Sequence, residues 1–299
     1  MNPHGIVDLR SPAKINLYLS VTGRRPDGYH NLETLMCAVA LYDRIRIQFE
    51  GRRIRVRCGH PGVPSDETNL VCRAVKALRS ALGGSPAAWP DGMTLHIDKS
   101  IPVGAGLGGG SSNAASVLMA LNRYLGDPIP HPELNRIGAS IGADVPFFLQ
   151  SGPAIARGIG EQLEAYHGLP SMTAVIVYPG FGVSTADTFG RLSLTLTKCQ
   201  KKLKKSLFNK NPFDLRKHLC NDLESVTMAE HPAIGAAKEA LVSWGADGAL
   251  MSGSGSAVYG LFKDTGAAQV ARVRIDAIHP EWQVFEAALM VERHWFPNG

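Results

Sequence analysis

The run of residues 102–115, PVGAGLGGGSSNAA, constrains the fold most, because five glycines and two serines stand directly before a helix-forming stretch. Glycine permits positive φ angles and keeps Cβ atoms away from a ligand. At the start of a helix the first backbone N–H groups lack partners within the helix, and the helix dipole adds partial positive charge beside them. We therefore predict that this run is a phosphate-binding loop that leads into a helix.

The spacing of Gly104, Gly106 and Gly109 also fits the G-x-G-x-x-G fingerprint of dinucleotide-binding folds. That fold needs an acidic residue at the end of the next strand, roughly 20 residues further on. Asp127 has about this distance, but it stands in a Leu-Gly-Asp-Pro sequence that is typical of a turn. No Gly-Lys-Ser or Gly-Lys-Thr occurs, which excludes a P-loop with its lysine. A turn that only caps a helix is the plain structural alternative, and it would need fewer glycines.

Length and cysteine usage set the broad class of protein. A chain of 299 residues, 44% of them hydrophobic, is long enough for one large or two medium domains. The five cysteines are odd in number and never spaced C-x-x-C, so we expect free thiols in a reducing compartment, without a zinc site or a disulfide framework. The N-terminus lacks the apolar core of a signal peptide, and no stretch approaches the roughly 18 apolar residues of a membrane span. We expect a soluble, cytoplasmic protein without a membrane partner.

The formal net charge of +5 fits nucleic acid, an anionic small substrate or simply a basic surface. Arginines alternate with apolar residues at 44–49 and 53–58, across a turn at 50–52. This pattern predicts a β-hairpin with one buried face and one arginine-coated face in solvent. A lysine-rich insert near Lys198–Lys210 has no interleaved aromatic residues and is predicted to be a surface loop, so we expect no nucleic-acid partner.

Apolar periodicity predicts strands and helices without strict βαβ alternation. Strands are expected at 16–22, 44–49, 53–58, 93–98, 173–178, 248–251, 257–262 and 283–289. Helices are expected at 70–82, 111–125, around 134–141, and at 185–192, 214–224, 234–244 and 267–278. This mixture favours an α+β fold in two halves over a doubly wound sheet. We place one domain at residues 1–167 and the other at 168–299.

Three blocks of sequence, taken together and in this order, resemble the GHMP kinase superfamily of small-molecule kinases. They are residues 12–19 (PAKINLYL), the glycine run, and residues 251–259 (MSGSGSAVY). Residues 25–34 (RPDGYHNLET), 142–148 (GADVPFF) and 221–224 (NDLE) narrow the resemblance to the family that phosphorylates 4-diphosphocytidyl-2-C-methyl-D-erythritol. The resemblance covers nearly the whole chain, and the lysine-rich insert is the main departure from the family pattern. It implies a two-domain GHMP kinase fold, with a ribosomal-protein-S5-like N-terminal domain and a ferredoxin-like C-terminal domain.

The resemblance implies transfer of the γ-phosphoryl group of ATP to the 2-hydroxyl of this cytidine diphosphate-linked alcohol, with Mg²⁺ as the metal cofactor. Such a transfer depends on positioning and on stabilising charge on the transferring group. The implied ATP-binding residues are Pro102, Val103, Gly104, Ala105, Gly106, Leu107, Gly108, Gly109, Gly110, Ser111 and Ser112. Ser111 or Ser112 would hydrogen-bond the triphosphate or reach Mg²⁺, and the metal ligands stay open.

Lys14 and Asp144 match the positions that carry the chemistry in this family. Asp144 would accept the proton of the substrate hydroxyl late in the reaction, because a carboxylate is too weak a base to remove it early. Lys14 beside it would keep the carboxylate ionised and stabilise developing negative charge. Taken alone, Asp144 is typical of a turn or helix N-cap, and Lys14 of an exposed strand start. Their joint presence in matching motifs favours catalysis.

The cytidine end of the substrate needs an aromatic face and hydrogen-bonding groups. Tyr29 and Phe189 match the family's stacking positions and His30 its cytosine-reading position, with Phe181 as the alternative to Phe189. Asn16 and Thr185 are weaker candidates for substrate contacts. The turn at Gly253–Ser256 is expected to close the second domain against the nucleotide site, and its alternative role is a tight hairpin between strands.

Two other functions compete with this one. Another GHMP kinase, acting on homoserine or mevalonate, would give no reason for an aromatic residue and a histidine at positions 29 and 30. An RNA-binding protein could use the arginine and lysine clusters, but this function leaves the glycine run without a role. We therefore expect a small-molecule partner and a monomer or homodimer.

Overall fold

The computed structural model describes residues 5–83, 89–150, 152–193, 197, 199 and 213–292. Apart from Cys199, the lysine-rich insert predicted to be a surface loop lies outside these residues. The chain forms two compact units, which we describe separately. Unit 1 comprises Met1–Ala13, Tyr42–Val103 and Gly108–Ser151, and unit 2 comprises Lys14–Leu41, Gly104–Leu107 and Gly152–Gly299. The division after residue 167 stays a prediction.

Unit 1 contains strands β3 (Ile54–Cys58) and β4 (Met93–Asp98) and the second part of β2 (His30–Gln48). β4 pairs antiparallel with β2 and parallel with β3, so it lies between them. The predicted hairpin across residues 50–52 is therefore wrong. The apolar residues of β4 are all buried, which suits it to the central place better than the arginine-rich β3. The predicted alternation is confirmed, since Ile45 and Ile47 are buried while their arginine neighbours are exposed.

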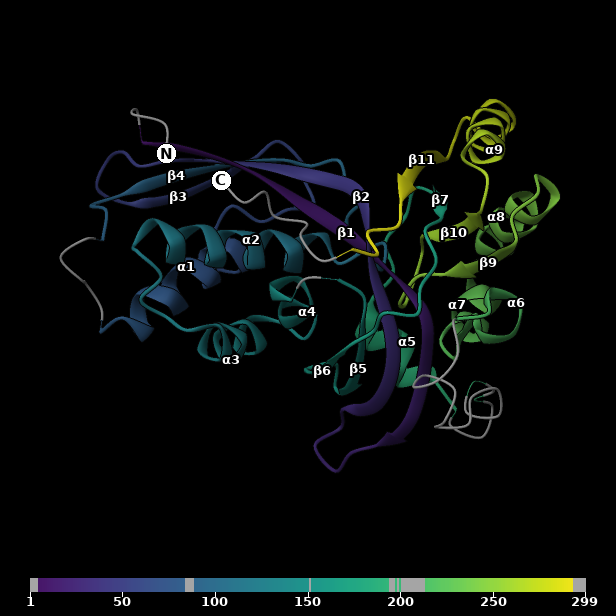
Figure 1. Cartoon of the computed structure of the whole chain (residues 1–299), viewed down its shortest axis with the longest axis horizontal. Helices are drawn as coiled ribbons and strands as arrows, with labels where there is room; N and C mark the ends of the chain where they lie inside the picture. Colours follow the sequence, from purple (N-terminus) through teal and green to yellow (C-terminus); the bar gives the residue numbers. More distant parts are fainter. Residues whose placement is uncertain are drawn as a thin grey trace. The chain divides into compact units, whose positions relative to one another are not determined.

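Four helices of unit 1 lie on one side of these strands, as Figure 1 shows: α1 (Leu70–Ala81), α2 (Gly109–Tyr124), α3 (His131–Ile141) and α4 (Val145–Leu149). The Oδ1 atom of Asn69 accepts a hydrogen bond from the N–H of Val71 at 2.8 Å and so caps α1. The helices predicted at 70–82, 111–125 and 134–141 are confirmed. The short α4 was not predicted, because five residues show no helical period.

Unit 2 contains the other parts of two long strands, which belong to the same seven-stranded sheet as β3 and β4. β1 (Ile6–Arg24) pairs in parallel with the short β8 (Cys220–Asn221) at Tyr18 and Leu19. The first part of β2 pairs antiparallel with β5 (Ala154–Gly158), which pairs with β6 (Gln162–Ala165). Because β1 and β2 each contribute to both units, residues 14–41 belong to the same compact unit as the C-terminal half of the chain.

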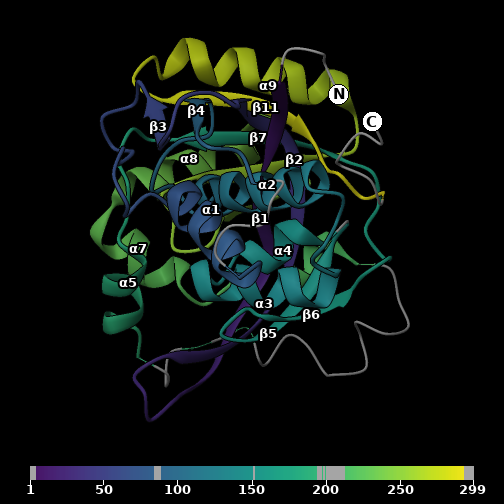
Figure 2. The ribbon, with the colours of Figure 1, turned by 90° about the vertical axis from the view of Figure 1, so that its left-hand side faces the viewer.

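The second sheet lies in unit 2, is antiparallel and has the strand order β11-β7-β10-β9. Its strands are β7 (Thr173–Tyr178), β9 (Gly248–Met251), β10 (Val258–Phe262) and β11 (Gln283–Ala288). Helices α8 (Pro232–Ser243) and α9 (Thr265–Ile278) pack on one face of it (Figures 1 and 2) through a core that includes Val175, Leu241 and Ile275. This is the strand order and βαββαβ succession of a ferredoxin-like fold, as predicted.

Residues 214–224 do not form the single helix that we predicted. They form α6 (Leu215–His218) and β8, and α7 (Glu224–Glu230) starts at the end of this range. The Asn221 side chain donates to backbone carbonyl groups of Met251 and Gly253, and β8 pairs with β1. These tertiary contacts outweigh the weak helical periodicity of the segment.

Cys199 and Cys220 form a disulfide, so the expectation of free thiols throughout is wrong. The two residues are 21 positions apart, and the position of Cys220 depends on tertiary contacts such as the pairing of β8 with β1, which the spacing of cysteines in the sequence does not reveal. Cys37, Cys58 and Cys72 are free, as expected. The cytoplasmic location, which we based partly on the cysteines, stays a prediction. Across the described part of the chain, no helix combines the length and apolar character needed to cross a bilayer.

Candidate active site

The first half of the glycine run, Gly104–Leu107, lies in unit 2 and packs against other backbone segments. Gly106 has a φ of +77°, and a Cβ there would overlap the carbonyl oxygen of Ser252. Gly104 has a φ of +67°, and its Cβ would be 3.2 Å from the Cα of Gly182. The carbonyl oxygen of Leu107 accepts a hydrogen bond from the N–H of Lys14 at 2.9 Å. Here glycine is required because backbones approach closely.

The second half of the run, Gly108–Ser112, lies in unit 1 and begins α2. Gly108 is the N-cap with a φ of +70°, and it has no side chain to satisfy the amides of the first turn. The Ser112 hydroxyl is buried and has no hydrogen-bond partner within the described structure. A Cβ on Gly110 would meet only the Cδ1 of Leu70, at 3.5 Å. Open space, free amides and an unpaired hydroxyl suit an anion here.

A buried lysine that the sequence analysis missed lies beside this helix start. A Cβ on Gly109 would be 2.9 Å from the Nζ of Lys99. The ammonium group pairs with the buried carboxylate of Asp43, whose Oδ1 also accepts the N–H groups of Ser100 and Ile101, each at 2.9 Å. This ion pair places the ammonium group of Lys99 next to the predicted phosphate site. Its sequence position, just before the glycine run, was the available clue.

Asp144 stands directly before α4 in unit 1 and is half-buried. Asp144 occupies the turn and N-cap position that the alternative interpretation expects, but its side chain makes no capping hydrogen bond to that helix. A Cβ on Gly142 would be 3.7 Å from the Oγ of Ser111. The segment that carries Asp144 therefore lies beside the first turn of α2.

Lys14 lies within β1 and is only 4% exposed, so it is not the exposed lysine of the alternative interpretation. Its Nζ donates to the Oδ1 of Asn16 at 2.5 Å. The Nδ2 of Asn16 donates to the Thr34 hydroxyl at 2.8 Å, and that hydroxyl donates to the carbonyl oxygen of Tyr18 at 2.6 Å. The chain of hydrogen bonds fixes the orientation of Lys14 and Asn16. Thr34 was not predicted as a site residue, although it stands in the motif at residues 25–34.

The turn at Gly253–Ser256 joins the antiparallel strands β9 and β10, so it is a hairpin turn. It also touches the glycine run within unit 2. The hydroxyl of Ser252, another residue that we missed, donates to the carbonyl oxygen of Gly106 at 3.0 Å. The hydroxyl of Ser254 shares a 2.9 Å hydrogen bond with that of Thr185, the first residue of α5 (Thr185–Arg191). Two sequence motifs more than a hundred residues apart thus meet.

Two of the predicted cytidine-binding residues lie together in unit 2. The rings of His30 and Phe189 stack with centroids 5.2 Å apart and an angle of 24° between their planes. The ring of Phe181 instead packs against that of His231, with centroids 4.7 Å apart. Burial, with a smaller contribution from the charge of Arg24, lowers the pKa of His30, which favours the neutral imidazole. Tyr29 is 62% exposed, so its ring is accessible to a ligand.

Comparison with known proteins identifies two matching family models. The N-terminal domain of GHMP kinases matches residues 69–152, and the C-terminal domain of GHMP kinases matches residues 201–279. The first match contains the glycine run and Asp144, and the second contains the turn at Gly253–Ser256.

Curated relatives extend the similarity over almost the whole chain. A 4-diphosphocytidyl-2-C-methyl-D-erythritol kinase of Syntrophus aciditrophicus is 45% identical over 268 residues, which cover 89% of this chain and 93% of the relative. The enzyme of the same name from Geobacter sulfurreducens is 42% identical over 289 residues, 96% of each chain.

Solved structures agree with this similarity. A crystal structure of 4-(cytidine 5'-diphospho)-2C-methyl-D-erythritol kinase superposes with a TM-score of 0.76 at 31% identity and covers 95% of this chain and 99% of that one. The homoserine kinase of Cytophaga hutchinsonii superposes with a TM-score of 0.72 over 98% of this chain and 97% of that one. At 19% identity it shares the fold alone.

Proposed function

Since this chain belongs to the 4-diphosphocytidyl-2-C-methyl-D-erythritol kinase family of the GHMP kinases, we propose that it phosphorylates the 2-hydroxyl of that alcohol with ATP. One observation supports the proposal most within the structure: the start of α2 combines a glycine N-cap, free first-turn amides and an unpaired buried Ser112 hydroxyl. These are the groups that bind a polyphosphate.

ATP would lie with its triphosphate on the amides of Gly108–Ser111, since the N–H of Ser112 already donates to the carbonyl oxygen of Gly108. The ammonium group of the buried Lys99 lies next to Gly109, and its charge is balanced by the carboxylate of Asp43. Mg²⁺ prefers oxygen ligands and keeps several waters, so the Ser111 or Ser112 hydroxyl with phosphate oxygens fits its chemistry. When bound, the metal neutralises charge on the triphosphate. The protein contributes orientation and the exclusion of solvent.

Asp144 would orient the substrate hydroxyl and accept its proton once the new O–P bond is largely formed. Lys14 would stabilise the negative charge that grows on the attacking oxygen. The hydrogen bond from Lys14 to Asn16 supports this role, because it holds the ammonium group of a buried side chain in one orientation.

The cytosine ring would stack on Tyr29 and Phe189, and His30 would read its edge. The contact between His30 and Phe189 favours Phe189 over Phe181 for this role. A neutral imidazole has one donor and one acceptor nitrogen, which suits the mixed donor and acceptor edge of cytosine. Asn16 and Thr185 would add polar contacts to the substrate.

The experiment that tests this function compares acceptor alcohols. Purified protein is given ATP and Mg²⁺ with the cytidylyl alcohol, with homoserine or with mevalonate, and ADP release is measured. We expect turnover with the cytidylyl alcohol alone. Turnover with homoserine or mevalonate, but not with the cytidylyl alcohol, would assign the chain to another branch of the GHMP kinases.

A further inference from the structure

The segment Asn221–Glu224 is buried and polar, and the proposed reaction gives it no role. Asn221 is 6% exposed and Asp222 is 5% exposed, and the Glu224 side chain is 14% exposed. Buried polar groups are costly unless hydrogen-bonded, so their partners indicate what the segment is for.

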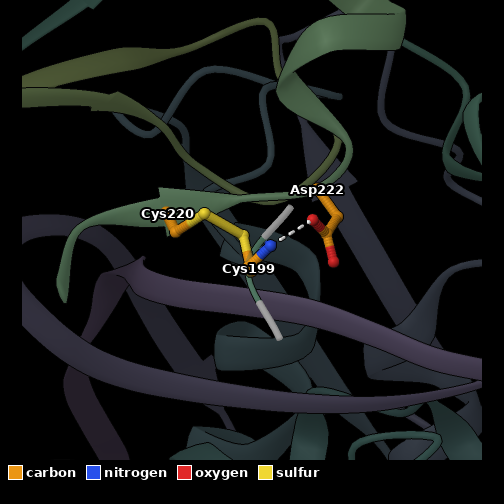
Figure 3. Close-up of side chains that lie close together, drawn as sticks. All are labelled: Cys199, Cys220 and Asp222. Atoms are coloured by element: carbon orange, nitrogen blue, oxygen red, sulfur yellow. Dashed lines mark hydrogen bonds between the residues drawn. A yellow bond between two sulfur atoms is a disulfide. The ribbon is translucent and has the colours of Figure 1, made fainter. Parts of the chain in front are cut away.

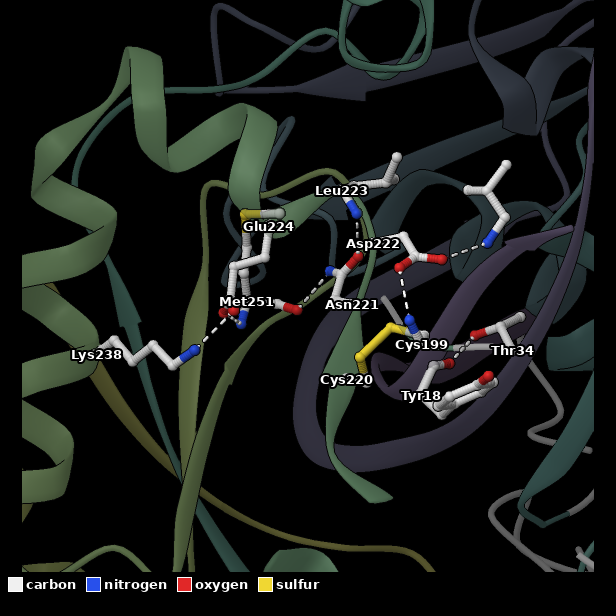
Figure 4. Close-up of a disulfide and its surroundings, with 11 residues drawn as sticks. Tyr18, Thr34, Cys199, Cys220, Asn221, Asp222, Leu223, Glu224, Lys238 and Met251 are labelled. Atoms are coloured by element: carbon white, nitrogen blue, oxygen red, sulfur yellow. Dashed lines mark hydrogen bonds and ion pairs between the residues drawn. A yellow bond between two sulfur atoms is a disulfide. The ribbon is translucent and has the colours of Figure 1, made fainter. Parts of the chain in front are cut away.

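Asn221 uses its whole amide group on backbone atoms. Its Nδ2 donates to the carbonyl oxygen of Met251 at 2.9 Å and to that of Gly253 at 2.7 Å, and its Oδ1 accepts the N–H of Leu223 at 2.9 Å. Glu224 accepts the N–H of Met251 at 3.0 Å and pairs with Lys238 at 2.7 Å (Figure 4). The Asn221 side chain therefore fixes the carbonyl groups of Met251 and Gly253, which lie on either side of Ser252.

The residues held in this way touch the predicted nucleotide loop and a predicted substrate residue. The Ser252 hydroxyl donates to the carbonyl oxygen of Gly106 at 3.0 Å. A Cβ on Gly253 would be 3.3 Å from that same oxygen and 3.4 Å from the Oδ1 of Asn16. A displacement of residues 251–253 would therefore reach both Gly106 and Asn16, because no space separates them.

The residues on either side of Asn221, Cys220 and Asp222, are themselves held in place. The two carboxylate oxygens of Asp222 accept the N–H of Cys199 at 3.0 Å and the N–H of Val21 at 2.9 Å. Cys220, which directly precedes Asn221 in the sequence, forms a disulfide with Cys199, and Figure 3 shows this disulfide beside Asp222. Because the sulfur atoms are bonded to each other and both carboxylate oxygens are engaged, this cluster serves as an anchor rather than as a metal site.

We propose that Asn221 is a positioning residue for ATP: it fixes Met251–Gly253, and through Ser252 it sets the position of the Gly104–Leu107 loop. The inference rests on the proposed function, because Leu107 is bonded to Gly108, where the triphosphate would begin to bind. Asn221 is not itself a contact of the reacting groups.

The test replaces Asn221 by Asp, which keeps the shape and the Oδ1 acceptor but removes the amide donor to two carbonyl groups. The matched control is Asn122→Asp at the other end of α2, where a buried amide donates to the carbonyl oxygen of Ile129 at 2.9 Å and to the Oδ1 of Asp127 at 3.3 Å. Both variants lose an amide that donates two hydrogen bonds, and Asn122 lies outside the proposed site.

We expect Asn221→Asp to raise the KM for ATP about tenfold with a smaller change in kcat, while Asn122→Asp leaves the KM unchanged. Hydrogen exchange of the amides of residues 251–256 should quicken in Asn221→Asp alone, at a temperature where both variants are folded. Asn221→Ser serves as the milder variant if Asn221→Asp does not fold.

Equal effects of Asn221→Asp and Asn122→Asp on the KM and on exchange would overturn the inference. A wild-type chain that does not phosphorylate the cytidylyl alcohol would instead contradict the proposed function. Exchange at residues 251–256 would still decide whether Asn221 holds the turn, so the two failures are distinguishable.

Discussion

The two halves of the glycine run use the same amino acid for different physical reasons. In Gly104–Leu107, glycine is required by the protein itself, because a Cβ on Gly106 would overlap the carbonyl oxygen of Ser252. In Gly108–Ser112, a Cβ on Gly110 meets nothing closer than 3.5 Å, and the unpaired groups are those of the helix start. Gly106 is therefore needed to build the loop, whereas Gly110 is left open for a ligand. The same substitution at these two positions should have opposite effects on stability.

The largest expected effect is that of Gly106→Ala, which tests the close packing of Gly104–Leu107. The positive φ and the overlap with Ser252 together predict a loss of about 3 kcal/mol or more in the free energy of unfolding. Chemical denaturation monitored by circular dichroism measures it. An unchanged denaturation midpoint would show that this half tolerates a side chain and would remove the distinction between the halves.

Asp144→Asn tests the chemistry beside Gly108–Ser112, at the start of α2. If the carboxylate accepts the hydroxyl proton, turnover should fall roughly 100-fold or more while ATP affinity and melting temperature stay unchanged. Steady-state kinetics and calorimetric ATP binding give the two quantities. Near-normal turnover would exclude Asp144 as the base.

Gly110→Ala makes the same substitution in the second half of the glycine run, Gly108–Ser112. Because residue 110 lies in the first turn of a helix with room for a Cβ, the free protein should become more stable by about 0.5 to 1 kcal/mol. ATP binding should nevertheless weaken, since the methyl group would stand where a phosphate approaches. A variant that binds ATP like the wild type would place the triphosphate elsewhere.

The smallest expected effect is the pH dependence of substrate binding at the cytosine site, which lies outside the glycine run. Since burial lowers the pKa of His30 below its ordinary 6.5, the ring is neutral at pH 7 and gains a proton only in more acidic solution. The KM for the cytidylyl alcohol should therefore rise a few-fold as the pH falls below 6.5, while the KM for ATP does not follow. His30→Asn should abolish this pH dependence. If both KM values rise together with falling pH in the wild type, the effect does not belong to the cytosine site.

Much of the fold could be predicted because the deciding information was local. β4, β7 and β9 have the predicted bounds, and α1 begins at the predicted residue 70. The errors arose where distant segments decide the outcome. β3 pairs with β4 rather than with its sequence neighbour, and β8 replaces part of a helix because it pairs with β1.

The site divides in the same way. Motifs indicated Lys14, Asp144 and the turn at Gly253–Ser256, since each stands in a distinctive short sequence. Lys99 and Ser252 were missed, because their importance comes from what they touch. Lys99 lies against Gly109, and Ser252 lies against Gly106, and neither contact follows from spacing along the chain.

The most direct test of the central claim is a crystal structure of the protein with a non-hydrolysable ATP analogue and the cytidylyl alcohol. We expect phosphate oxygens within hydrogen-bonding distance of the amides of Gly108–Gly110. We also expect the cytosine ring between Tyr29 and Phe189, with the 2-hydroxyl beside Asp144. A triphosphate bound away from the start of α2, or a cytosine that contacts neither aromatic residue, would contradict the central claim.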